Sequence, residues 1–303
     1  MYNLAPWLAL VPLVFVVMFV IVGGINLGLP LAGLVKGRPL PAETLGRIAP
    51  LWESTVVFLV AALGATFSLF PAAFAVVGPL VAPLWVTATL LLAARVLLLA
   101  AGAATGGRAL RLTLVVVSLL VPVVLAQNIT VLLTGESDLW QHAGLAIALG
   151  ALAATFPPAL WGGYFYLPGA ASRSVARTAY WLALLLTTFT LPLAIVLDAN
   201  VLDGRSLLGL MWPLMAAGAL GIACLASERR RRYFLATATL VVGVALTLYL
   251  TLWPFILRPV LRLDTLIVTT PAQIWLAAAF AALVAVVTPA LYLLHRSVTT
   301  DER

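Results

Sequence analysis

Charged residues are scarce in this chain of 303 residues. Asp, Glu, Lys and Arg make up 9% of it, against roughly 25% in soluble domains. Hydrophobic residues make up 64%, and the mean hydropathy is +1.15. This shortage of charge excludes a water-soluble globular protein. The chain is therefore expected to be an integral membrane protein.

Residues that bind metals are equally few, since the chain has two histidines and one cysteine. His142 and His295 fall near opposite ends of the predicted membrane spans, and neither a His-x-x-x-His pattern nor a pair of acids accompanies them. Cys224 has no second cysteine with which to form an internal disulfide. The sequence therefore excludes a disulfide framework, and it offers no ligand set from which a redox cofactor site can be argued.

The net charge of +7 does not indicate a nucleic-acid-binding protein. The basic residues are scattered between apolar segments, where membrane topology explains them better than phosphate contacts do. One run, Arg229 to Arg232, has two interpretations. It either anchors a short inner loop or attracts anionic lipid headgroups.

Apolar runs long enough to cross a bilayer, roughly 20 residues each, divide the chain into about nine spans. The first run is too long for a signal peptide and lacks a cleavage site, so it is expected to be retained. Proline at 71 predicts a tight turn between the second and third spans. The predicted spans are 5–35, 53–70, 72–102, 110–133, 140–165, 175–199, 206–226, 232–257 and 272–296.

The distribution of Lys and Arg predicts the orientation of these spans. Most of the basic residues fall in alternate loops and in the C-terminal tail, while the remaining loops hold only Arg205, Arg258 and Arg262. The positive-inside rule then places the N-terminus outside and the C-terminus inside. We expect residues 1–303 to form a single membrane domain of antiparallel helices.

Two ionisable residues inside apolar segments are candidate functional residues, because burying a charge in a bilayer costs at least a few kcal/mol. Glu53 opens the second span from the inner side, and Arg95 lies about two turns from the inner end of the third. We predict that they approach within ion-pair distance. The alternative is that Arg95 extends to the inner headgroups, and that Glu53 is merely an acid in an early turn of its helix, where the helix dipole favours a negative charge.

The first span contains "GGINLGLPL", residues 23–31, in its inner half. Its glycines allow close helix packing, and Asn26 can hydrogen-bond across it. Packing alone would explain this segment. The functional interpretation is that Asn26 joins Glu53 and Arg95 in a polar cluster open to the inside.

These segments resemble subunit II of the cytochrome bd quinol oxidase family. The resemblance rests on "GGINLGLPL", on "IAPLWESTVVFLVAALGATFSLFPAAFAVV" (residues 48–77), on the arginine late in the third span, and on "LYLTLWPFILRPVLRLDTLIVTTPAQIWL" (residues 248–276). It covers the whole chain, with the specific motifs near its two ends. The positions that match the family motifs are Gly28, Pro50, Trp52, Pro254 and Phe255.

The chain also departs from the family pattern. Two acids of the first family block are replaced, one by Gly24 and the other by Asn26 or its neighbour. Glu53 keeps the acid of the second block, but "STV" follows where the family has Gly-Asn-Glu. An amide does not titrate, so of these positions only Glu53 could relay a proton.

The resemblance implies an all-α fold with two four-helix bundles plus one peripheral helix, in a prokaryotic plasma membrane. It implies a heterodimer with subunit I, which carries haems of the b and d types and the quinol site, and it allows a small single-span third subunit. Subunit II would bind no haem. It would support subunit I, hold a quinone or membrane lipid between helices, and contribute to proton uptake from the cytoplasm.

Two other functions stay open at this point. One is a stand-alone transporter or permease in which Glu53 and Arg95 gate a substrate. An odd number of spans gives no neat inverted repeat, which argues against it. The other is a scaffold subunit that has lost proton conduction, as Gly24 and Asn26 suggest.

Overall fold

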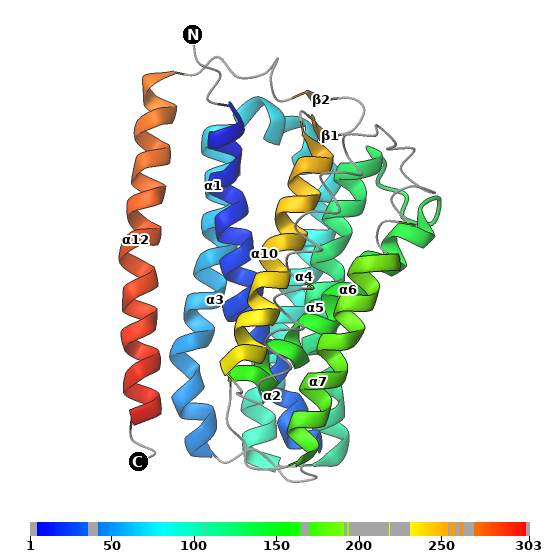
Figure 1. Ribbon diagram of the computed structural model, residues 1–303, viewed down its shortest axis with the longest axis vertical. Helices are drawn as coiled ribbons and strands as arrows, with labels where there is room; N and C mark the ends of the chain where they lie inside the picture. The colour runs from blue at the N-terminus through cyan, green and yellow to red at the C-terminus, as the bar shows by residue number, and fades with distance from the viewer. Residues whose placement is uncertain are drawn as a thin grey trace.

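Long antiparallel helices make up nearly all of the computed structural model (Figure 1). The structure describes residues 5–35, 42–105, 107–164, 170–190, 231–253, 255–257, 261–262 and 270–300, with the single positions 193 and 218. Side chains are described for fewer of these residues, and those of residues 32–35 and 42–55 are among the exceptions.

The first half of the chain forms five α-helices and one π-helical turn: α1 (Ala5–Met18), η1 (Phe19–Gly23), α2 (Gly24–Val35), α3 (Ala42–Leu69), α4 (Pro71–Thr105) and α5 (Arg108–Thr134). The described elements of the second half are α6 (Ala143–Tyr164), α7 (Ala170–Leu185), η2 (Leu186–Thr190), α10 (Arg231–Leu252), β1 (Phe255–Leu257), β2 (Leu261–Arg262) and α12 (Pro271–Thr300). The two strands pair as one short antiparallel hairpin.

Five helical segments of the described part are long and apolar enough to cross a membrane: Trp7–Gly28, Pro71–Ala101, Arg108–Thr134, Ala143–Leu160 and Phe234–Leu252. Two shorter apolar segments are Val56–Leu69 and Pro271–Ala285. An all-α membrane fold is therefore confirmed. Most of the predicted seventh span, 206–226, lies outside the described residues, so the number of nine spans stays a prediction.

Proline determines two helix boundaries. Phe70 is the single residue between α3 and α4, and Pro71 begins α4, as predicted. Proline is tolerated in a first helical turn, where its missing N–H has no partner to lose. The predicted span 232–257 is wrong at its end, because α10 stops at Leu252 and residues 255–257 form β1. Position 254 is a proline, and proline disfavours helical geometry in the residue before it.

Buried apolar side chains form two cores. One lies mainly among α6, α7 and α10, and includes Leu145, Leu152, Leu160, Tyr180, Ala183 and Leu240. The other lies mainly between α1 and α3, and includes Phe15, Phe19, Phe58, Ala65 and Leu69. α2 contacts both α5 and α6, so it connects α1 to the first core.

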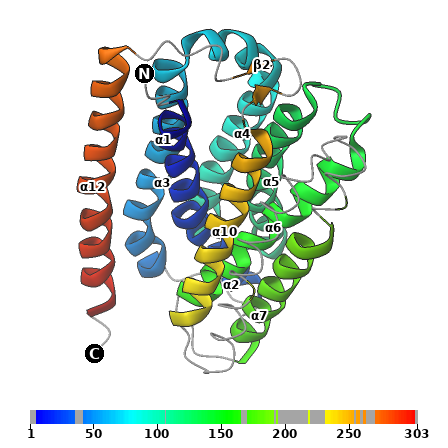
Figure 2. The ribbon, with the colours of Figure 1, turned by 45° about the horizontal axis from the view of Figure 1, so that its top comes forward.

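Helix α12 stands at the edge of the molecule in both views (Figures 1 and 2). It contacts α3 and α1. The Phe280 ring meets the Phe15 ring edge to face, with 5.6 Å between centroids. Gln273 Nε2 donates a hydrogen bond to the Leu69 carbonyl at 2.9 Å, which satisfies a carbonyl in the last turn of α3. These contacts hold α12 against one side of the α1–α3 pair.

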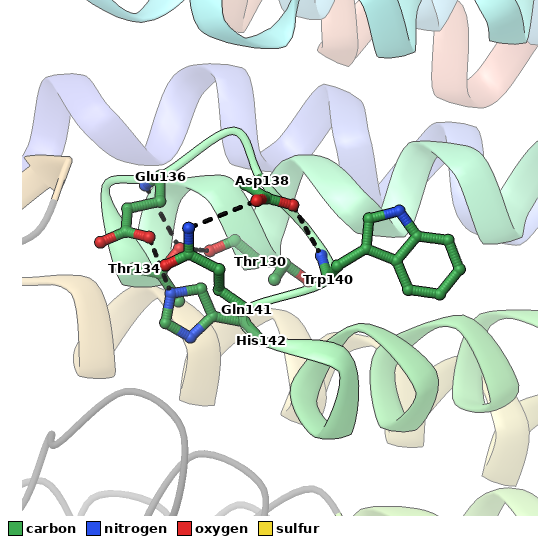
Figure 3. A network of polar contacts seen from close by, with 7 residues as sticks. All are labelled: Thr130, Thr134, Glu136, Asp138, Trp140, Gln141 and His142. Atoms are coloured by element: carbon green, nitrogen blue, oxygen red, sulfur yellow. Dashed lines mark hydrogen bonds and ion pairs between the residues drawn. The ribbon is translucent and has the colours of Figure 1, made fainter.

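Residues 135–142 connect α5 to α6 through a polar network (Figure 3). Gly135 ends α5 in the left-handed conformation, with φ of 76°, and its N–H bonds to the Val131 carbonyl at 2.8 Å. Asp138 accepts bonds from the Trp140 N–H and from Gln141 Nε2. These contacts stay within one loop and its helix end, as expected of turn structure rather than of a binding site.

Candidate functional site

Arg95 lies on α4 and is 1% exposed, which makes it the largest fully buried side chain of the described part. It lies inside the apolar segment Pro71–Ala101. The side chain is buried against other helices of the chain, which counts against the alternative in which Arg95 snorkels. A guanidinium held within a membrane span needs hydrogen-bond partners, because unpaired charge is costly there.

Asn26 on α2 supplies two of these partners. Arg95 Nη2 donates to the Asn26 main-chain carbonyl at 2.8 Å and to its side-chain Oδ1 at 3.0 Å. Asn26 is 3% exposed, so both bonds are shielded from solvent. The structure therefore brings Arg95 and Asn26 together, 69 residues apart in the sequence.

Ser118 on α5 supplies a third partner. Its Oγ accepts a hydrogen bond from Arg95 Nε at 3.0 Å, and the residue is 0% exposed. Sequence reasoning did not single out Ser118. Serine is common inside membrane helices, where its hydroxyl usually bonds within its own helix, so composition gives no signal of a contact across helices. The spacing to a neighbouring arginine could not be known before the helices were placed.

The three residues lie at one depth. α2 and α4 end, and α5 begins, at the lower edge of the molecule in Figure 1. Asn26, Arg95 and Ser118 each lie nine or ten residues from that end of their helix. At 1.5 Å per residue this is about 14 Å. The three residues therefore lie at a similar distance from the same end of the helix array.

All three described partners of Arg95 are neutral groups. The bonds account for three of the five N–H donors that a guanidinium carries. Among the residues whose side chains are described, these acceptors satisfy hydrogen bonds but supply no negative charge to the guanidinium. The arrangement therefore favours an anion beside Arg95, since a charge in a low-dielectric site gains most from a close partner of opposite sign.

Glu53 is the candidate for that anion. It belongs to α3, eleven residues from Ala42, so its main chain lies about 16 Å from the lower helix end. This depth is close to that of Arg95, and α3 contacts both α2 and α4. The Glu53 side chain lies outside the described residues, so its pairing with Arg95 stays a prediction.

The remaining family-motif positions are spread over the fold. Gly28 is buried in α2, and Phe255 begins β1 with Arg262 stacked over its ring, 5.7 Å from the centroid. Pro50 and Trp52 belong to α3, but their side chains lie outside the described residues, as does Pro254 altogether. Among these positions, Gly28 is the one on the same helix as Asn26.

Gly24 packs against α6. A Cβ added at Gly24 would lie 2.5 Å from Leu160 Cδ1, so any larger residue must displace that buried side chain. The small residue therefore has a packing role in this chain. It lets α2 approach α6 closely while Asn26, two residues further on, bonds to Arg95.

Comparison with known proteins agrees with a helical membrane protein. No curated protein matches the chain. The family described as cytochrome bd terminal oxidase subunit II matches residues 4–298, nearly the whole sequence. The chain therefore belongs to the cytochrome bd terminal oxidase subunit II family, whose complex is a membrane-bound oxidoreductase.

Proposed function

We propose that this chain is the non-haem subunit II of a bd-type quinol:dioxygen oxidoreductase, in which it supports the haem-bearing subunit I and contributes to proton uptake from the cytoplasm. The observation that carries the proposal is the guanidinium of Arg95, buried in a membrane span and bonded to Asn26 and Ser118 from two other helices. Ionisable groups at such depth mark ion or proton pathways more often than they serve packing.

The residues of the cluster have different roles in this proposal. Asparagine and serine carry no titratable proton at physiological pH, and arginine keeps its own, so none of them can exchange protons. Glu53 is the proton carrier. Arg95 provides a fixed positive charge that favours the ionised form of the Glu53 carboxylate. Asn26 and Ser118 hold the Arg95 guanidinium in its orientation through their hydrogen bonds.

Family membership supports a proposal for the rest of the complex. We expect haems of the b and d types and the quinol site in subunit I, together with a quinone or lipid held between helices and a small third subunit. We expect the whole chain, 1–303, to form one domain of about nine helices in a prokaryotic plasma membrane, with its C-terminus inside. Arg108 and Arg111 lie at the end from which the cluster is nearest, which supports uptake from the cytoplasmic side.

The test is Glu53→Gln, which keeps the shape of the side chain and removes its charge. We expect the complex to assemble with its haem partner and quinol-driven oxygen consumption to fall by on the order of tenfold or more, as for loss of a proton-transfer group. Glu136→Gln is the matched control, since Glu136 lies in the exposed loop between α5 and α6. Turnover that is unchanged in Glu53→Gln would remove Glu53 from the route.

The scaffold function remains a second candidate, because the observed partners of Arg95 are neutral. In a subunit without proton conduction, the bonds of Arg95 to Asn26 and Ser118 would serve only to hold α2, α4 and α5 together. In that case Glu53→Gln leaves turnover unchanged. The family match gives the stand-alone transporter no comparable support.

A further inference from the structure

The main-chain carbonyl of Asn26 is in an unusual position for a helix. Within an α-helix this oxygen accepts a hydrogen bond from the N–H four residues later. In α2 that residue is Pro30, which has no N–H. A carbonyl left without a donor inside a membrane costs several kcal/mol, because no water is present to replace the missing bond.

Arg95 supplies the missing donor. Its Nη2 carries two hydrogens and lies 2.8 Å from the Asn26 carbonyl and 3.0 Å from Asn26 Oδ1, so each hydrogen has an acceptor. The carbonyl bond is the shorter one. Pro30 is itself buried, as is Asn26, so solvent does not compete for either group.

The same spacing occurs on the other side of the guanidinium. Ser118, whose Oγ accepts from Arg95 Nε, precedes Pro122 by four residues in α5. There the bond goes to the Ser118 hydroxyl, whereas in α2 it goes to the main-chain carbonyl that proline leaves without a donor. On both helices, however, the residue that contacts Arg95 stands where proline has interrupted the pattern of main-chain hydrogen bonds.

We propose that Pro30 is a positioning residue: by withholding an N–H, it leaves the Asn26 carbonyl free to hold the guanidinium of Arg95 in its place between α2, α4 and α5. The value of this placement for proton uptake rests on the proposed function. The placement itself does not, since it depends only on the competition between two donors for one carbonyl. An N–H at position 30 would bond along the helix and weaken the bond to Arg95.

The test compares two changes at position 30 that differ in one N–H group and in the acceptor strength of the preceding carbonyl, which an ester weakens; the control pair at position 12 shares that second difference. Pro30→Ala introduces an N–H, whereas replacement of Pro30 by lactic acid gives the same methyl side chain on an ester link without an N–H. Both lose the proline ring equally, so any cavity cancels in the comparison. The same pair at Pro12, a proline inside α1 with Leu8 four residues before it, is the matched control.

The readout is the apparent Tm of the intact, purified complex. At position 12 we expect the alanine variant to be the more stable by on the order of 2 °C, because its N–H gains the Leu8 carbonyl. At position 30 we expect a clearly smaller difference than at position 12, because Arg95 already satisfies the Asn26 carbonyl and only the weaker ester carbonyl remains to separate the two variants. In an Arg95→Met background the difference at position 30 should return to the size seen at position 12. Equal differences at positions 12 and 30 in the parent background would overturn the assignment of Pro30.

The comparison within the parent background still decides the question if the Arg95→Met complex does not assemble. Oxygen consumption separates this inference from the proposed function. Activity that is lost in Pro30→Ala and restored by the lactic acid variant supports both. A Tm pattern as expected with unchanged oxygen consumption counts against the proton route and leaves the role of Pro30 standing.

Discussion

At the scale of single residues, Arg95 illustrates how a charge is kept inside an apolar helix. Its Nε and Nη2 atoms bond to acceptors on two other helices, all within 3.0 Å. Hydrogen bonds to a charged group contribute about 1.5–3 kcal/mol each, roughly twice the value for neutral pairs. Losing one acceptor should therefore be measurable even though no charge is removed.

Ser118→Ala tests this directly. We expect the free energy of unfolding of the complex to fall by about 1.5–3 kcal/mol, because Arg95 Nε loses its buried acceptor. The apparent Tm of the purified complex measures it. Thr113→Ala on the same helix is the control, since the Thr113 hydroxyl is exposed and bonds to the Ala109 carbonyl of its own helix. Equal shifts in the two variants would mean that the Arg95–Ser118 bond contributes nothing measurable.

The residues of the site differ in how far the sequence could identify them. Arg95 was recognisable because a charge interrupts an apolar run, and Asn26 because an amide stands among small residues. Ser118 gave no such signal, because hydroxyl side chains occur throughout these helices. Pro30 could be seen as a helix interruption, but its effect depends on a donor from another helix.

At the scale of elements, the hydrophobic pattern predicted the helices well and their ends less well. The first span, 5–35, is one continuous helical segment, but it contains the π-helical turn Phe19–Gly23, which no periodicity in the sequence indicated. A π-turn inserts a residue and rotates everything after it, and such turns often lie at functional sites. Here it lies immediately before the segment that carries Gly24 and Asn26.

Close packing of α2 on α6 gives a prediction at this scale. Gly24→Ala should lower the free energy of unfolding by about 1–3 kcal/mol, because the new Cβ would lie 2.5 Å from Leu160 Cδ1. Leu160 is fully buried, so it can yield only by disturbing its neighbours. Adding Leu160→Val, which removes the obstructing methyl group, should recover part of the loss. Thermal unfolding of the assembled complex measures both variants.

Gly64→Ala is the matched control for that change. Nothing lies within 4 Å of a Cβ added at Gly64, and the residue lies inside α3, five residues before the end of the helix at Leu69. Alanine should there be neutral or stabilising by roughly 0.5–1 kcal/mol, because it favours the helix. A Gly24→Ala complex that unfolds at the same temperature as the Gly64→Ala complex would contradict a close contact between Gly24 and Leu160.

At the scale of the whole molecule, the two ends of the helix array differ in composition. Trp7, Trp140 and Trp275 are exposed near the end that carries the β1–β2 hairpin. Arg108 and Arg111 begin α5 at the opposite end. Tryptophan favours both membrane interfaces, so it does not distinguish the two ends. Arginine favours the cytoplasmic side, so Arg108 and Arg111 support the orientation proposed from the sequence.

The fold class followed from composition alone, because a chain so poor in charge has few ways to satisfy its backbone except as helices in a membrane. The arrangement of the helices did not follow. Each span is apolar around much of its surface, so its sequence does not say which side meets a neighbour and which meets lipid. That is why Arg95 was expected beside Glu53 but its contact with Ser118 was not.

Proton uptake by the purified complex tests the central claim most directly. The complex would be isolated through this chain, together with its haem partner, as the parent, as Arg95→Leu and as Arg111→Leu. Arg111→Leu removes a positive charge near the first residue of α5, outside the bonds between Arg95 and Asn26. A pH-indicating dye then follows protons taken up after an oxygen pulse. We predict that uptake slows by on the order of tenfold in assembled Arg95→Leu and is unchanged in Arg111→Leu. Uptake as fast in assembled Arg95→Leu as in the parent would contradict the account.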